Sequence, residues 1–176
     1  QYQWMLGPSM MACPLGGNDF DTAESRDVYL PEGVWMDYET GETFTGPVTL
    51  KNYPQPVGKI PVFIGGAGIT VTTGPDGQGC FAEVYAVAPA GTVYRFTHPD
   101  GESRSVIRVD GGFGTRTVSG PGSGTSDGDT GSSSRRDLRR WTVTDPATGA
   151  EIPFTAEAHK LTFRLLPGRD YTVSPR

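Results

Sequence analysis

The residues that first invite a chemical interpretation are two carboxylates in the segment Trp35-Met36-Asp37-Tyr38-Glu39. Paired carboxylates carry out glycoside hydrolysis, and retention of configuration needs two carboxyl groups roughly 5–5.5 Å apart across the scissile bond. On a β-strand, Asp37 and Glu39 would point the same way, about 6.6–7 Å apart by the rise per residue. Two neighbours on one face cannot attack one side of a sugar ring and protonate the other. We therefore predict no catalytic residue in this pair.

The remaining nucleophile and metal chemistries have little support in the sequence. His98 and His159 are the only histidines, in a predicted turn and at a predicted strand start, and there is no Gly-x-Ser-x-Gly elbow. Cys13 and Cys80 are too few for a disulfide framework and lack the spacing of a zinc site. We expect two buried thiols, no metal site and no cofactor, and the sequence singles out no substrate-binding residue.

Two acidic clusters could be imagined as calcium sites. Asp19, Asp21 and Glu24 lack the spaced ligands and the central glycine of a known calcium loop, so we favour a solvated connection there. Asp127 and Asp129 lie in the Gly/Ser-rich stretch 119–136, where calcium binding and a solubilising loop are both open interpretations.

Composition predicts an all-β fold. The 176 residues include 25 glycines and 15 prolines, and no window shows the apolar period of a long amphipathic helix. That length fits one large domain or two small domains. Aromatic residues such as Trp35, Tyr94 and Phe96 are expected to fill cores rather than to form a sugar-stacking platform.

Charge and hydropathy narrow the list of partners. The net charge is -5, and basic residues are scattered except at 135–136 and 139–140, which argues against nucleic acid. We find neither a run of eighteen apolar residues nor a leader-like start, so no membrane partner is expected. Residues 1–15 are apolar on both faces, which predicts a strand buried on both sides and a chain cut from a larger protein.

The turn chemistry divides the chain into two antiparallel β-domains of sandwich type. Residues 26–68 contain short apolar runs separated by predicted turns at Pro31-Glu32-Gly33, Thr40-Gly41-Glu42 and Gly46-Pro47. A further strand at 69–73 precedes the turn cluster 74–79, where we place the boundary between a proximal domain (16–74) and a distal domain (79–176). In the distal domain the hairpin turn at 98–101 and the alternation of Leu161, Phe163 and Leu165 are the clearest signals.

Three motifs in this order resemble the end of glycoside hydrolase family 31, the α-glucosidase and α-xylosidase family. The first is Gly7-Pro8-Ser9 with the apolar run to Pro14, the second runs from Val28 to Glu42, and the third is Lys59 to Gly68. The matching positions, which we interpret as structural, are Gly7, Pro8, Pro14, Leu30, Pro31, Gly33, Trp35, Asp37, Gly41, Ile60, Pro61, Val62, Phe63 and Gly68.

This resemblance implies a function for the parent protein. Residues 1–15 would be the last strand of a (β/α)8 catalytic barrel, and both catalytic aspartates of a retaining α-glycosidase would lie upstream. The partners implied are the barrel, an N-terminal β-domain of the same enzyme and a carbohydrate substrate such as an α-linked glucoside or xyloside. A secreted or periplasmic location is favoured. The acidic Tyr-Glu-Asp-Asp-Gly segment of many members has no equivalent here, and the alternative is a free-standing carbohydrate-binding or adhesion module.

Overall fold

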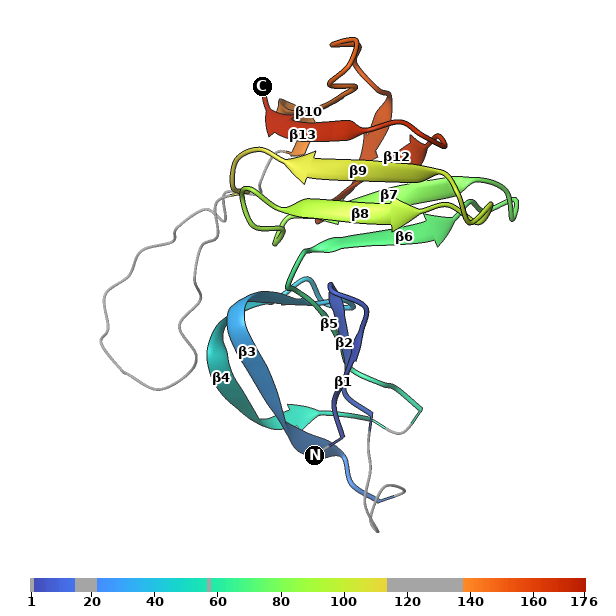
Figure 1. Cartoon of the computed structure of the whole chain (residues 1–176). Helices are drawn as coiled ribbons and strands as arrows, with labels where there is room; N and C mark the ends of the chain where they lie inside the picture. The colour runs from blue at the N-terminus through green and yellow to red at the C-terminus, as the bar shows by residue number, and fades with distance from the viewer. Residues whose placement is uncertain (1, 15–21, 57, 114–137) are drawn as a thin grey trace, which may run out of the picture.

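The chain is nearly all β in a computed structural model that describes residues 2–14, 22–56, 58–113 and 138–176 (Figure 1). This confirms the predicted fold class. The described residues contain no α-helix, only one short 3-10 helix, η1 (Leu138–Arg140). No helix within these ranges has the length and hydropathy of a membrane span.

The proximal domain is one curved antiparallel sheet with the strand order β1-β2-β5-β3-β4 (Figure 1). Its strands are β1 (Trp4–Leu6), β2 (Met10–Ala12), β3 (Ser25–Asp37), β4 (Thr43–Pro54) and β5 (Val62–Ile64). The sheet curls around a core whose buried members are Met11, Cys13, Val28, Leu30, Trp35 and Phe63.

Pro31-Glu32-Gly33 does not form the turn that its chemistry predicts. It lies inside the 13-residue strand β3 as a bulge, where the pairing register with β4 shifts between Leu30 and Gly33. The bulge brings the two backbones so close that a Cβ on Gly46 would lie 1.8 Å from the Pro31 carbonyl oxygen. Glycine is therefore required at position 46, and the bulge bends β3 around the core.

Residues 1–15 also differ from the prediction of one strand buried on both faces. Residues 4–12 form a hairpin in which β1 pairs with β2 and β2 pairs with β5, so these residues belong to the proximal sheet. Met11 is buried, but Trp4, Met5 and Leu6 are 53%, 48% and 56% exposed. A continuous apolar run does not reveal which of its residues are buried, because burial depends on neighbours elsewhere in the sequence.

The distal domain is a sandwich of two four-stranded sheets, ordered β10-β13-β9-β8 and β11-β12-β7-β6 (Figure 1). Its strands are β6 (Ile69–Thr73), β7 (Cys80–Tyr85), β8 (Val93–Thr97), β9 (Arg104–Val109), β10 (Trp141–Thr144), β11 (Phe154–Ala156), β12 (Lys160–Leu165) and β13 (Tyr171–Pro175). The predicted alternation in β12 is confirmed, since Leu161, Phe163 and Leu165 are all buried in the sandwich core.

The domain boundary lies earlier than residues 74–79. Strand β6 pairs with β7 along its whole length, from Ile69↔Val84 to Thr73↔Cys80, so it belongs to the distal sandwich. The turn cluster at 74–79 is therefore the turn of a β-hairpin. The expected Gly/Ser loop at 119–136 lies outside the described residues.

The two domains meet at a joint formed by a separate apolar cluster. Met36 and Ile64 of the proximal sheet pack there with Tyr85 and Val87 of the distal domain. Backbone contacts reinforce the joint, because Ile69 N donates to Ser9 Oγ at 3.1 Å and Tyr85 N donates to Gly68 O at 2.9 Å. We call the four apolar residues Met36, Ile64, Tyr85 and Val87 the joint cluster.

A charged network supports the distal side of the joint. Lys160 Nζ lies 2.5 Å from Glu83 Oε1, and Glu83 Oε2 accepts hydrogen bonds from Thr70 Oγ1 and Tyr85 OH. Desolvation raises the pKa of Glu83, but these hydrogen bonds outweigh it and hold that pKa below the ordinary value. The network joins β6, β7 and β12 beside Tyr85, a member of the joint cluster.

Replacing Ser9 with alanine tests the joint. Ser9 is 1% exposed, so Ser9→Ala leaves the buried Ile69 N–H without its acceptor and should lower the free energy of unfolding by about 1–3 kcal/mol. Chemical denaturation measures the change, with Ser174→Ala on β13 as the control, because Ser174 is only partly buried. Equal effects of the two substitutions would contradict this role of Ser9.

Candidate functional site

The sequence motifs come together around the end of β3 and the joint. Trp35 and Asp37 lie on β3, which pairs with β5 through Met36↔Ile64 and Asp37↔Phe63. The other motif positions occupy the β1–β2 turn (Gly7, Pro8), the segment after β2 (Pro14), the first part of β3 (Leu30, Pro31, Gly33), the β3–β4 turn (Gly41), the approach to β5 (Ile60, Pro61), β5 itself (Val62, Phe63) and the approach to β6 (Gly68).

The carboxylate of Asp37 is fully engaged in hydrogen bonds. Its Oδ1 accepts from the backbone N–H groups of Glu39 at 2.9 Å and Thr40 at 2.6 Å, and its Oδ2 accepts from Tyr53 OH at 2.6 Å. The residue is 5% exposed. A carboxylate that accepts two backbone N–H groups of the following turn fixes that turn, and we infer that this is the role of Asp37.

Tyr53 is suited to remain a donor to Asp37. Desolvation by burial raises the pKa of its hydroxyl, and the hydrogen bond to Asp37 raises it further. The ring is held against Phe44 and Phe63, with centroid distances of 6.3 and 5.3 Å. The phenol therefore stays protonated at neutral pH and satisfies the buried carboxylate.

Glu39 has a different environment from Asp37. Asp37 ends β3, whereas Glu39 lies in the following turn, so the two residues do not share a strand face as the sequence analysis expected. The side chain of Glu39 is 69% exposed and its Oε1 lies 2.5 Å from Lys59 Nζ. That neither residue is catalytic stays a prediction.

The aromatic residue in the same motif is a core residue. Trp35 is 3% exposed, and its Nε1 donates to the Pro31 carbonyl oxygen at 2.9 Å across the β3 bulge. Its ring lies directly over Gly65, where an added Cβ would come within 2.5 Å of it. Tyr94 and Phe96 pack partly buried against the distal core, in line with the expectation for aromatic residues.

Both histidines contact other residues of the fold. His98 is buried, with Nε2 2.9 Å from Ser105 Oγ, and Ser105 Oγ in turn donates to Leu166 O. His159 packs over Gly41, where a Cβ would lie 2.3 Å from the imidazole Nε2. His159 thus contacts the β3–β4 turn from the distal domain.

Neither cysteine forms a disulfide, and the two differ in burial. Cys13 is buried, and burial raises the pKa of its thiol to about 11. Cys80 is only partly buried, so the expectation of two buried thiols holds for Cys13 alone. The described ranges contain no group of three or more potential metal ligands; Asp19, Asp21, Asp127 and Asp129 lie outside them.

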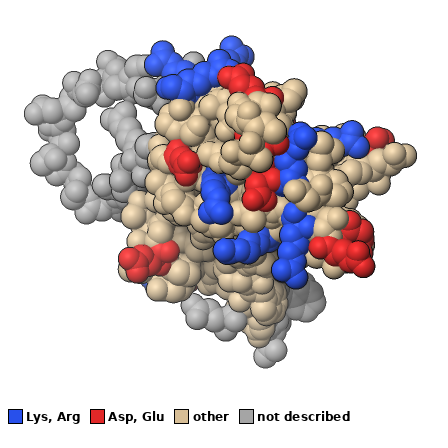
Figure 2. All heavy atoms as spheres, turned by 45° about the horizontal axis from the view of Figure 1, so that its top comes forward, with Lys and Arg blue, Asp and Glu red and all other residues tan. Residues whose placement is uncertain are grey.

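The surface charge of the distal end is mixed. Figure 2 shows Lys and Arg side chains interspersed with Asp and Glu on this face. Nucleic-acid binding needs a basic patch or stripe that tracks the phosphates. The absence of a nucleic-acid partner stays a prediction.

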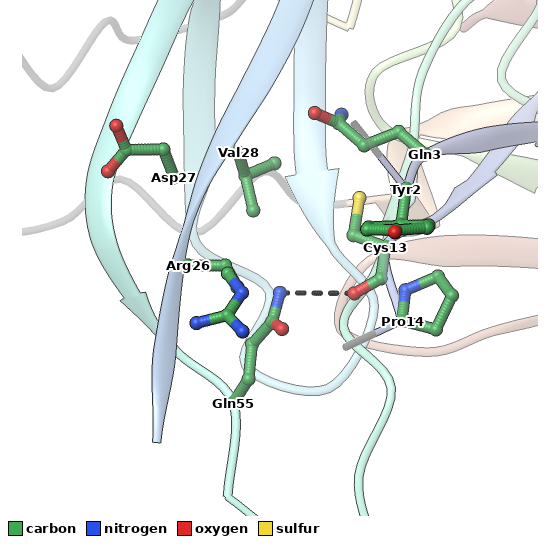
Figure 3. A pocket seen from close by; sticks show the side chains of 8 residues that line it. All are labelled: Tyr2, Gln3, Cys13, Pro14, Arg26, Asp27, Val28 and Gln55. Atoms are coloured by element: carbon green, nitrogen blue, oxygen red, sulfur yellow. Dashed lines mark hydrogen bonds between the residues drawn. The ribbon is translucent and has the colours of Figure 1, made fainter. Parts of the chain in front are cut away.

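A pocket that sequence reasoning missed lies where the curved proximal sheet fails to close, between the β1–β2 hairpin and the start of β3 (Figure 3). Two glutamines span this seam. The Gln3 amide pairs with both backbone groups of Tyr29, at 2.8 and 3.0 Å, and Gln55 Nε2 donates to Cys13 O at 3.0 Å. The pocket has a volume of about 260 Å³ and is lined by Tyr2, Gln3, Cys13, Pro14, Arg26, Asp27, Val28 and Gln55.

The first part of the chain is similar to a known protein family. Residues 1–69 match the family model described as the glycosyl hydrolase family 31 C-terminal domain. The match includes residues 4–12, which pair within the proximal sheet, and the assignment of residues 1–15 to a barrel strand stays a prediction. It also ends at Ile69, the first residue of β6.

Two individual proteins are similar to parts of the chain. A 1,6-alpha-glucosyltransferase from Sporosarcina globispora is 35% identical over 63 residues, which are 35% of this chain and 5% of the relative. The crystal structure of an alpha-xylosidase of glycoside hydrolase family 31 from Xanthomonas citri matches with a TM-score of 0.34 and 21% identity, covering 62% of this chain and 10% of the xylosidase. The chain thus spans a small fraction of the length of either protein.

Alanine substitutions at Asp37 and Glu39 test whether Asp37 stabilises the fold while Glu39 does not. Asp37→Ala should lower the free energy of unfolding by about 2–4 kcal/mol, because three donors lose a buried acceptor. Glu39→Ala should change it by no more than about 0.5 kcal/mol, since its ion pair is exposed. Thermal or urea unfolding of both variants provides the measurement, and a mild Asp37→Ala phenotype would refute the structural assignment.

Proposed function

We propose, from the premise that residues 1–69 are a C-terminal domain of glycosyl hydrolase family 31, that this chain is a non-catalytic part of a larger α-glycoside hydrolase. In this proposal the catalytic aspartates lie elsewhere in the parent enzyme. The substrates are α-linked glucosides, xylosides or related oligosaccharides, and the parent performs hydrolysis or transglycosylation. The chain braces the catalytic barrel.

The observation that carries the bracing role is the exposed apolar surface of β1. Trp4, Met5 and Leu6 are consecutive, and each is about half exposed. Strand β1 is also the edge of its sheet, paired only with β2 among the described strands. Exposed apolar residues on an unpaired edge strand mark an interaction site or an aggregation hazard. A preceding domain of the parent packed on β1 would cover them.

The joint extends this role to the distal domain. The joint cluster and the Ser9–Ile69 hydrogen bond fasten the distal sandwich to the proximal sheet. A domain that packs on β1 therefore also positions the distal sandwich. In the parent, both β-domains would be held beside the barrel by one contact surface.

A second candidate, a free-standing carbohydrate-binding module, rests on exposed aromatic rings. Tyr2, Trp4 and Tyr29 are each between 42% and 53% exposed in one region of the proximal domain. Exposed aromatic rings can stack on sugars, although rings that sit beside exposed Met5 and Leu6 suit a protein contact at least as well.

Hydrogen exchange in the full-length parent distinguishes the two functions. If a preceding domain covers β1, backbone amides of residues 4–6 should exchange at least about 10-fold more slowly in the parent than in residues 1–176. Amides of β8, on the distal domain, serve as the control and should be unchanged. Equal exchange of residues 4–6 in both proteins, together with glycan binding that Trp4→Ala abolishes, would favour the binding module and overturn the brace.

A further inference from the structure

The β1–β2 hairpin has two different faces, which the register of its strands assigns. Residues that stand opposite each other in an antiparallel pair place their side chains on the same face of the sheet. Met5 stands opposite Met11, Met11 stands opposite Phe63, and the last two belong to the buried proximal core. Met5 therefore lies on the inner face. Because successive side chains alternate, Trp4 and Leu6 lie on the other side of the sheet, which we call the outer face.

The outer face carries an apolar row that leads from the exposed edge of the sheet to the joint. Leu6 stands opposite Met10, and Met10 stands opposite Ile64, which in turn pairs with Met36. Ile64 and Met36 are buried in the joint cluster, and Met10 is half-buried against that cluster. Leu6, at the other end of the row, is 56% exposed. The distal sandwich thus covers one end of this row, while no residue that the structure describes covers the other end.

A second row beside the first has the same character. Trp4 stands opposite Ala12, and Ala12 stands opposite Val62. The two rows comprise Leu6, Met10, Ile64, Met36, Trp4, Ala12 and Val62. None of these side chains carries a charge, and only the Trp4 indole is a hydrogen-bond donor. A partner on the outer face therefore needs an apolar surface, because polar groups buried against these rows would lose water without gaining a hydrogen bond.

The free edge of β1 is less accessible to a partner than the outer face. Gln3, directly before β1, pairs its side-chain amide with both backbone groups of Tyr29 on β3, at 2.8 and 3.0 Å. The first part of β3 thus lies across the seam from the start of β1. A strand added to β1 would have to enter this seam and displace the Gln3 amide, whereas a surface packed on the outer face would leave that pairing intact.

We propose that the domain preceding this chain in the parent packs an apolar, uncharged surface on the outer face of the β1–β2 hairpin, over Trp4, Leu6 and Met10, and adds no strand to β1. This inference rests on the proposed function, which supplies the covering domain. Continuity with the joint favours that occupant, because a domain of the same chain already buries one end of the first row. A sugar is disfavoured, since its hydroxyls would find one donor and no carboxylate or amide in these rows.

Hydroxyl-radical footprinting of Trp4 in the full-length parent tests this packing. Trp4 should oxidise at least about 5-fold more slowly in the parent than in residues 1–176, because the core of an interface excludes water. Leu6→Asp places a charge within the proposed contact and should return Trp4 oxidation to the rate found in residues 1–176. Met5→Asp is the matched control and should leave Trp4 protected, because Met5 is similarly exposed but lies on the inner face.

The same two substitutions in the 176-residue chain show whether the hairpin still folds. Both variants should keep the wild-type amide NMR spectrum outside β1 and β2. If either aspartate unfolds the hairpin, Leu6→Ser and Met5→Ser replace the pair, and the same difference in Trp4 protection is expected in the parent.

Amide exchange of residues 4–6 distinguishes failure of this inference from failure of the proposed function. Slow amides with equal Trp4 oxidation in the parent and in residues 1–176 would indicate strand addition at the edge. Equal loss of Trp4 protection in the Leu6 and Met5 variants would place the contact elsewhere on β1. Either result overturns the packing proposed here and leaves the brace in place. Fast amides with an unprotected Trp4 would refute the brace itself.

The remaining occupants of the outer face give their own results in the same experiment. Trp4 protection that disappears when the parent is diluted would assign the outer face to a second copy of the parent. Protection that appears only after maltotriose is added would assign it to a glycan. Both results would overturn the inference.

Discussion

The register between the end of β3 and β5 is the constraint on which the remaining structure depends. Because successive side chains of a strand point to opposite faces, Trp35 enters the proximal core and Met36 enters the joint cluster. The pairing Met36↔Ile64 places Ile64 of β5 beside Met36, so that both residues enter the joint cluster. A slip of one residue would reverse both faces, so this register fixes the proximal core and the contact with the distal domain together.

The Asp37 turn follows from the same register. Once Asp37 is placed opposite Phe63, its carboxylate lies in an apolar setting and needs donors, because an unpaired buried charge is strongly unfavourable. The turn backbone and Tyr53 supply them. Gly41 completes the turn at a φ of +74° beneath His159, a position with no room for a side chain. The contacts of Asp37 are thus those that folding of the β3–β4 turn requires.

The sequence analysis predicted the features that depend on residues close together in the sequence. It missed the features that depend on contacts between residues far apart in the sequence. The alternation in β12 and the His98-Pro99-Asp100-Gly101 turn are local, and both are found in the structure. Pro31-Glu32-Gly33 has the chemistry of a turn, yet its position opposite Gly46 makes it a bulge within β3. The residues of β1 are as apolar as core residues, and only the strand order shows that they lie at an edge.

The seam pocket shows most clearly why sequence patterns could not identify this site. Gln3 and Gln55 belong to no motif, and their role arises because the β1–β2 hairpin and β3 approach without backbone pairing, so that side-chain amides span the gap. Tyr2, at the pocket, lies only two residues before Trp4 on the exposed edge. Anything packed on β1 would therefore also border the pocket.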